Sequence, residues 1–199
     1  ADAETAELIE IKELAWLARD GVGLERSVLI DGVNAKALSP AMQKKSTELR
    51  ARAEVTWTMV RELTSRPGVP DEVVQAIKIA HAQVFETYDK MRLGFYVALT
   101  PGQAPPVPVE ELVARSNAAL DLLMEVSNTA MVTAERRGTK LLDELVRVAL
   151  DDGLRERGEA VSTMFCTAPG IYRKFGYEGV PSYDTGEGPA AALARTGAP

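Results

Sequence analysis

The sequence of 199 residues predicts an all-α protein: an antiparallel four-helix bundle with an irregular C-terminal appendage. Apolar residues recur at helical spacing through most of the first 150 residues, and proline- and glycine-containing motifs divide this pattern into four long segments. A hydrophobic content of 46% with 26% charged residues is typical of a folded globular protein. We therefore expect a bundle over residues 1–150 and an irregular tail over residues 151–199.

The first predicted helix begins near the N-terminus and carries two adjoining apolar seams. One seam consists of Leu8, Ile11, Ala15, Ala18 and Val22, and the other of Leu14, Leu17, Leu24 and Val28. Gly21 and Gly23 interrupt the pattern, and each costs roughly 1 kcal/mol relative to alanine inside a helix. This cost indicates a packing or a ligand reason for the two glycines, and of these we expect the close approach of a neighbouring helix.

The second helix begins at the motif "LSPAM", where Ser39 is a helix N-cap and Pro40 fits the first helical position. Its seam has the 4,3,4,3 spacing of a bundle and consists of Leu49, Ala53, Thr56, Val60 and Leu63. The motif "SRPGVP" ends this helix.

The third helix begins at Asp71, where acidic residues suit the helix dipole, and its inner row consists of Val73, Ile77, Ala80, Val84 and Met91. After the stiff stretch "TPGQAPPVPVEE", a fourth helix begins near Val109. Its seam runs through Leu112, Ala119, Leu122, Val126 and Ala130 and continues either as one rod or as two segments broken at "ERRGT". Leu49, Val60, Val84, Leu122 and Val126 should share one core.

Composition excludes several classes of function. A formal net charge of −6 argues against nucleic acid as a partner, because binding phosphates needs a basic excess. The only histidine, His81, cannot form a metal cluster or a Ser-His-Asp triad by itself, so we expect a half-buried or surface helical residue and no metal. The only cysteine, Cys166, excludes an intrachain disulfide and is expected to be a buried structural thiol.

The first two thirds of the chain resemble the four-helix ligand-sensing ectodomains of bacterial chemotaxis and related receptors. The resemblance rests on "IKELAWLARDGVGLERSVL", "LSPAMQKKSTELRARAEVTWTMV" and "RSNAALDLLMEV". It implies a periplasmic sensor without a cofactor, which binds a small molecule between helices and shifts the first helix relative to the fourth. It implies membrane attachment only through helices absent from this chain. The broad apolar face of the first helix also predicts a homodimer.

Six residues are candidates for binding a small anionic or polar ligand. Arg19 and Arg26 lie two helical turns apart and can project from one face, although exposed pairing with nearby acids explains them equally. An aromatic wall with a guanidinium group suits a small anion, and ordinary bundle packing is the alternative explanation for these residues. The residues proposed for that wall are Trp16, Trp57, Tyr88 and Arg92.

Residues 132–180 resemble the acetyl-CoA-binding half of GCN5-related N-acetyltransferases, most closely those of the enhanced-intracellular-survival type. The resemblance rests on "AERRGTKLL" and "GIYRKFGYE". It implies that a glycine-rich turn presents backbone N–H groups to the coenzyme pyrophosphate, and that Tyr172 protonates the departing thiolate. The residues of that turn are Arg136, Arg137, Gly138, Thr139 and Lys140.

The sequence therefore leaves two functions open, and we rank the sensor above an acetyl-CoA-dependent N-acetyltransferase of cytoplasmic location or a degenerate relative. Lys140 stands where the acetyltransferase turn has a small residue, and residues 1–131 predict helices where that enzyme needs strands. We expect acetyl-CoA to bind weakly or not at all, with no acetyl transfer to amines.

Overall fold

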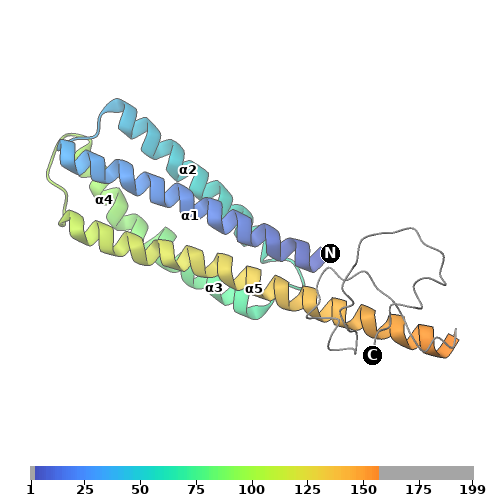
Figure 1. Ribbon diagram of the computed structural model, residues 1–199. Coiled ribbons are helices and arrows are strands. Elements are labelled where there is room, and N and C mark those ends of the chain that lie inside the picture. Colours follow the sequence, from blue (N-terminus) through green and yellow to red (C-terminus); the bar gives the residue numbers. More distant parts are fainter. Residues whose placement is uncertain (1–2, 157–199) are drawn as a thin grey trace, which may run out of the picture. The chain divides into compact units, whose positions relative to one another are not determined.

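The computed structural model describes residues 3–156, which form helices joined by short loops, with no strand among them. The predicted all-α class is confirmed. Figure 1 shows four helical rods lying side by side. The rods are α1 (Ala3–Ala35), α2 (Pro40–Leu63), a third rod made of α3 (Asp71–Ala80), the π-helix η1 (His81–Tyr88) and α4 (Asp89–Leu99), and α5 (Val109–Glu156).

The contacts between Cα atoms divide the chain into two units, Ala1–Gly138 and Thr139–Pro199. The bundle described below belongs to the first unit, which includes α5 as far as Gly138. The predicted tail beyond Glu156, with Cys166 and Tyr172, lies outside the described residues. The domain boundary at residue 150 therefore stays a prediction.

The predicted start of α2 is confirmed. The Ser39 hydroxyl accepts a hydrogen bond from the Met42 backbone N–H at 3.3 Å, and Pro40 occupies the first turn. The turn that follows α2 contains Gly68 with φ +102°, a left-handed conformation that glycine adopts at little cost.

α1 and α2 approach closely at Gly21, as the sequence predicts. A Cβ atom added to Gly21 would lie 3.0 Å from the Ala53 Cβ and 3.1 Å from the Leu49 carbonyl oxygen. At Gly23 the nearest atom would be 3.7 Å away, on Leu120 of α5, which is ordinary van der Waals contact. Only Gly21 is therefore required by the packing of the two helices.

The third rod contains a π-helix that the sequence analysis did not predict. The Thr87 hydroxyl donates to the Ala82 carbonyl at 3.0 Å, five residues earlier, within the wider turns of η1. The buried residues of this rod follow at intervals of four from Ala80 through Val84 and Tyr88 to Arg92. In an α-helix each such interval rotates the side chain by about 40°, whereas wider π turns reduce this drift and keep the row facing the core.

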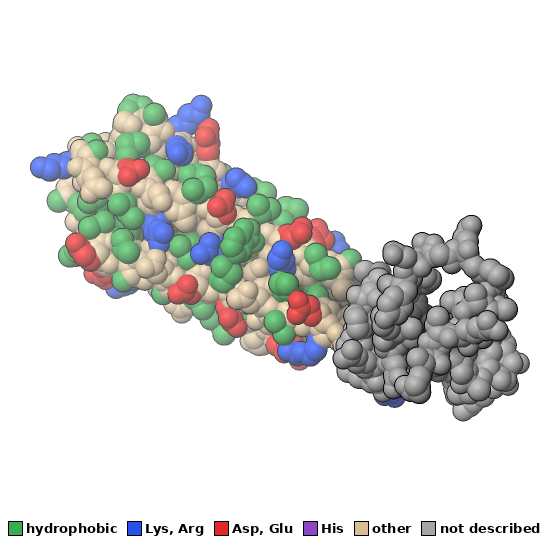
Figure 2. All heavy atoms as spheres, in the orientation of Figure 1, with side chains coloured by type: hydrophobic (Ala, Val, Ile, Leu, Met, Phe, Trp, Pro, Cys, Tyr) green, Lys and Arg blue, Asp and Glu red, His purple; other side chains and the backbone are tan. Residues whose placement is uncertain are grey.

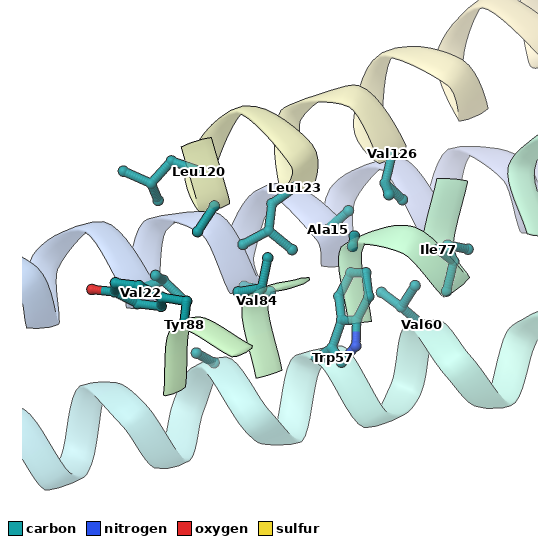
Figure 3. Packing of buried hydrophobic residues seen from close by; sticks show 14 of the residues in the cluster. Ala15, Val22, Trp57, Val60, Ile77, Val84, Tyr88, Leu120, Leu123 and Val126 are labelled. Carbon is teal, nitrogen blue, oxygen red and sulfur yellow. The ribbon is translucent and has the colours of Figure 1, made fainter. Parts of the chain in front are cut away.

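The core forms where one face of each rod meets the others (Figure 3). Val60, Val84 and Val126 are fully buried in one hydrophobic cluster, and the half-buried Leu49 and Leu122 pack against that cluster, which confirms the predicted common core. In α1 the seam from Leu8 to Val22 is buried, whereas Leu24 of the second seam is exposed. We call the part of the core formed by Ala15, Trp57, Val60, Ile77 and Val126 the apolar section.

α5 is one continuous helix from Val109 to Glu156, so the alternative of two segments broken at "ERRGT" is wrong. Its first buried residues match the predicted seam, with Leu112, Ala119, Val126 and Ala130 facing the core. Gly138 does not break the helix, because an α-helix accommodates a single glycine at a cost of about 1 kcal/mol.

Candidate functional site

A cluster of charged side chains is buried in the bundle beside the apolar section. Arg92 Nη1 donates to Glu25 Oε1 at 2.8 Å, and the Ser46 hydroxyl donates to the same oxygen at 3.1 Å. Asp89 accepts from Arg92 Nε at 2.7 Å and from Arg50 Nη2 at 2.8 Å. We call the five residues Glu25, Ser46, Arg50, Asp89 and Arg92 the charged section. Its members come from α1, α2 and α4, so it links three of the four rods.

Burial determines the electrostatics of this section. Glu25 is only 1% exposed, and burial raises its pKa, while Arg92, Arg50 and the Ser46 hydrogen bond partly oppose this rise. Burial and the nearby Glu25 carboxylate raise the pKa of Tyr88 to about 12. The charged form of Glu25 thus depends on its two basic neighbours.

The six predicted ligand-binding residues lie in different surroundings, and their role in ligand binding stays a prediction. Trp16 is 46% exposed, and the Arg19 guanidinium lies 5.1 Å from the centre of its ring. Arg26 instead reaches α5, where its Nη1 donates to Asn117 Oδ1 at 2.6 Å. These contacts fit the packing and surface-pairing alternatives.

The other three predicted ligand residues are buried among different partners. Trp57 is 2% exposed, stacks on Phe85 with ring centres 5.1 Å apart, and donates from Nε1 to His81 Nδ1 at 3.1 Å. Tyr88 and Arg92 lie in or beside the charged section. His81 is half-buried on the helical rod, as predicted.

Sequence reasoning missed Glu25, Ser46, Arg50 and Asp89, although the spacing contains a signal for two of them. Glu25 continues the buried seam of α1 between Val22 and Leu29 at intervals of three and four. In α2, Arg50 likewise lies three residues before the buried Ala53. A charged residue in register with a core seam predicts a buried ion pair, because an unpaired charge is too costly to bury.

The predicted coenzyme turn is wrong in its conformation. Arg136, Arg137, Gly138, Thr139 and Lys140 all lie inside α5, where backbone N–H groups bond to carbonyls four residues earlier. Arg136 Nη1 lies 3.3 Å from Glu72 Oε1, and Arg137 Nη2 lies 2.7 Å from Glu4 Oε2. The role of these residues in binding stays a prediction.

Grooves open on the surface of the described part of the first unit. One, of about 620 Å³, lies between α2 and the α3–η1 segment beside His81, Arg61 and Lys78. A second, of about 550 Å³, lies between α3 and α5. A third, of about 230 Å³, lies over Arg50 and Arg92 of the charged section.

A comparison with protein-family models gives one similarity. The model described as an acetyltransferase (GNAT) domain matches residues 121–180, under a third of the chain. No curated protein and no solved structure matches the chain. The match supports the predicted resemblance of residues 132–180 to acetyltransferases and includes the end of the bundle as well.

The prediction of a periplasmic chemotaxis-receptor sensor is wrong, because the family model that matches is that of a GNAT acetyltransferase domain, over residues 121–180. The helical resemblance that led to it reflects the bundle pattern, which many helical proteins share. Separately, no helix in residues 3–156 is both long enough and apolar enough to cross a membrane. The predicted homodimer stays a prediction.

Proposed function

We propose that this chain is a divergent relative of the GNAT acetyltransferases that binds acetyl-CoA weakly and does not transfer the acetyl group to amines. The observation that carries the proposal is the family match over residues 121–180. Acetyl-CoA is the acetyl donor that this resemblance implies.

The described part of the matched segment does not fit a backbone site for the coenzyme pyrophosphate. Such a site needs free N–H groups at a turn or at a helix N-terminus. Residues 136–140 lie 27 or more positions beyond the start of α5 at Val109, so their N–H groups are already bonded within the helix. No catalytic step through the coenzyme follows from these residues.

The side chains in this stretch offer a diphosphate positive charge instead. Arg136 and Arg137 are adjacent in sequence, and both are engaged in ion pairs, with Glu72 and Glu4. Partly exposed ion pairs contribute about 0–1 kcal/mol, so a doubly charged phosphate group can compete with these carboxylates. Attraction of this kind is weak and sensitive to salt.

The helices that precede the match support the proposed lack of acetyl transfer. The resemblance requires strands on the substrate side of the coenzyme segment, and in this chain α1 to α4 occupy residues 3–99. Those helices bury their apolar faces against one another and against α5. A sheet in their place would require the bundle core to be dismantled.

Calorimetric titration of the full chain with acetyl-CoA tests the proposal. We expect a dissociation constant above about 10 μM, corresponding to less than roughly 7 kcal/mol of binding free energy. The double variant Arg136→Gln/Arg137→Gln should weaken binding severalfold. Arg115→Gln is the matched control, since Arg115 is another exposed arginine of α5 with a carboxylate partner, Glu111. Release of free thiol from acetyl-CoA in the presence of amines should not exceed the rate without protein.

Gly138→Asp distinguishes the proposal from a working acetyltransferase. No described atom lies within 4 Å of a Cβ added at Gly138, so the aspartate fits without a clash. We expect this variant to retain the weak binding. A low-micromolar dissociation constant that Gly138→Asp abolishes, together with thiol release, would establish a backbone coenzyme site and an active enzyme. No heat of binding at millimolar acetyl-CoA would reject coenzyme binding altogether.

A further inference from the structure

The groove between α3 and α5 combines exposed apolar side chains with an unpaired carboxylate. Figure 1 shows the two helices side by side, and Figure 2 shows that exposed hydrophobic and charged side chains alternate over the described surface. In this groove Ile79 is 53% exposed and Val132 is 47% exposed, and Leu122 is half-buried between the helices. Its volume of about 550 Å³ lies within the range of small-molecule sites, roughly 300–1,000 Å³.

The charges in the groove do not balance. Glu72 and Glu125 are its two carboxylates and Arg136 is its one guanidinium, so the net charge is −1 at neutral pH. Arg136 forms an ion pair with Glu72, in which Arg136 Nη1 lies 3.3 Å from Glu72 Oε1. The Thr133 hydroxyl also donates to that oxygen at 2.7 Å. The negative charge that remains belongs to Glu125.

Glu125 has no cationic partner among the described residues. Its only hydrogen bond there comes from the Thr129 hydroxyl, at 3.4 Å. Asp121, four residues earlier on the same helix, adds a second negative charge instead of a compensating positive one. A cation from solution is therefore the complement that this carboxylate lacks.

Two side-chain amides extend the polar edge of the groove. Gln75 of α3 and Asn128 of α5 line it, and neither amide bonds to another described group. Each amide has a carbonyl oxygen that can accept a hydrogen bond. A carboxylate and two amide oxygens together suit a primary ammonium group, which has three N–H donors and no acceptor.

From these contacts we propose that the groove between α3 and α5 binds a small amphipathic primary ammonium ion, with its apolar body on Ile79, Leu122 and Val132 and its ammonium group at Glu125. The two other grooves described above lack this combination. Around His81 the charges of Arg61 and Lys78 are matched by Glu62 and Glu86. Over the charged section, Arg50 and Arg92 already hold carboxylates. The proposal does not rest on acetyl-CoA binding, and its test uses no coenzyme, because Arg136 lines this groove and is also proposed to contact the coenzyme.

Titration of the full chain with n-hexylamine at neutral pH tests the site, with calorimetry as the readout. Three comparison compounds with similar alkyl chains separate the contributions. Hexanol keeps the apolar body without charge, hexyltrimethylammonium keeps the charge without N–H donors, and hexanoate reverses the charge. We expect hexylamine to bind roughly threefold to fivefold more tightly than hexanol, the range of a partly exposed ion pair. Hexanoate should bind more weakly than either.

Two variants and a control locate the binding. Glu125→Gln should remove the preference for hexylamine over hexanol, and Val132→Gln should weaken both compounds alike. Glu135→Gln, a change at another exposed carboxylate of α5 outside the groove, should alter neither. Because Glu125 and Val132 are exposed, the circular dichroism spectra and melting temperatures should match those of the unchanged protein.

Two results would overturn the site. One is that hexylamine binds no more tightly than hexanol, and the other is that Glu125→Gln keeps the full preference. Equal affinity for hexylamine and hexyltrimethylammonium would overturn the assignment to a primary ammonium, since the N–H donors would then contribute nothing.

Discussion

The charged section and the apolar section of the bundle core share α1, α2 and the third rod, but they hold the rods together in different ways. Around Ile77, Val60 and Val126, burial of hydrocarbon is favourable in any well-packed geometry. Around Glu25 and Arg92, burial is tolerated only because each charge has hydrogen-bonded partners at defined positions. One bundle thus combines a core section that tolerates small changes in geometry with a section that depends on defined hydrogen-bond positions.

The charged section should be the more fragile of the two when one member is removed. A buried ion pair often contributes little net stability compared with an apolar replacement, whereas a buried charge that has lost its partner is costly. The apolar section loses stability in proportion to the cavity that a truncation leaves. The following predictions test this contrast, beginning with the largest effect.

Arg92→Met should lower the free energy of unfolding by about 3–5 kcal/mol at neutral pH. The variant leaves the Glu25 carboxylate buried with the Ser46 hydroxyl as its remaining hydrogen-bond donor. Urea unfolding followed by circular dichroism measures the change. Since burial already raises the pKa of Glu25, its protonation on acidification should make the loss smaller near pH 5 than near pH 8.

The double variant Glu25→Leu/Arg92→Met is the control for this experiment. It removes both charges of the pair and leaves the contact between Arg50 and Asp89 in place. Most of the lost stability should return, because neither charge is then unpaired. A double variant as unstable as Arg92→Met would show that the side-chain shape, and not the charge pairing, holds the charged section together.

Ile77→Ala should lower the free energy of unfolding by about 3 kcal/mol, within the range of roughly 2–5 kcal/mol for such truncations. Ile77 is fully packed in the apolar section, so the variant creates a cavity lined by hydrocarbon. The loss should be the same near pH 5 and near pH 8, unlike that of Arg92→Met. The same urea experiment measures it, and a strong pH dependence would contradict the division of the core into two sections.

His81 should give the smallest effect, and it tests the one polar contact of the apolar section. Burial, and then the nearby Arg61, lower the pKa of His81, while Glu86 partly opposes them. The unprotonated Nδ1 accepts the hydrogen bond from Trp57 Nε1–H, and protonation of this nitrogen would remove that acceptor. A lowered folded-state pKa means that stability is fully present above the ordinary value of about 6.5 and is lost as pH falls below it.

The measurement compares urea midpoints at about pH 7.5 and about pH 5.5 for the unchanged protein and His81→Gln. The glutamine keeps an acceptor oxygen for Trp57 but does not titrate. The urea midpoint of His81→Gln should therefore decrease less on acidification than that of the unchanged protein. Identical declines would assign the pH dependence to other groups, since His81 is the only histidine in the chain.

The helices were largely predictable because their signals are local. The Ser39 cap, the Pro40 start and the break at "SRPGVP" depend on residues a few positions apart, and the structure confirms that α2 begins and ends there. The π-helix was missed because its extended turns are selected by the register of the core, with buried residues at intervals of four from Ala80 to Arg92. The different surroundings of the candidate ligand residues could not be predicted for a similar reason, since Trp16 and Trp57 look alike in sequence but face solvent and core.

By itself, the sequence determined the all-α class, the four rods and the hydrophobic seams, because periodicity, caps and breakers act over one or two turns. The tertiary structure decided which polar residues meet: Glu25 with Arg92, Trp57 with His81, and Arg136 with Glu72. These partners are 67, 24 and 64 positions apart in the chain. Spacing within one helix fixes the face on which a side chain lies, but the pairing of faces depends on how the rods pack, and packing is a property of the whole bundle.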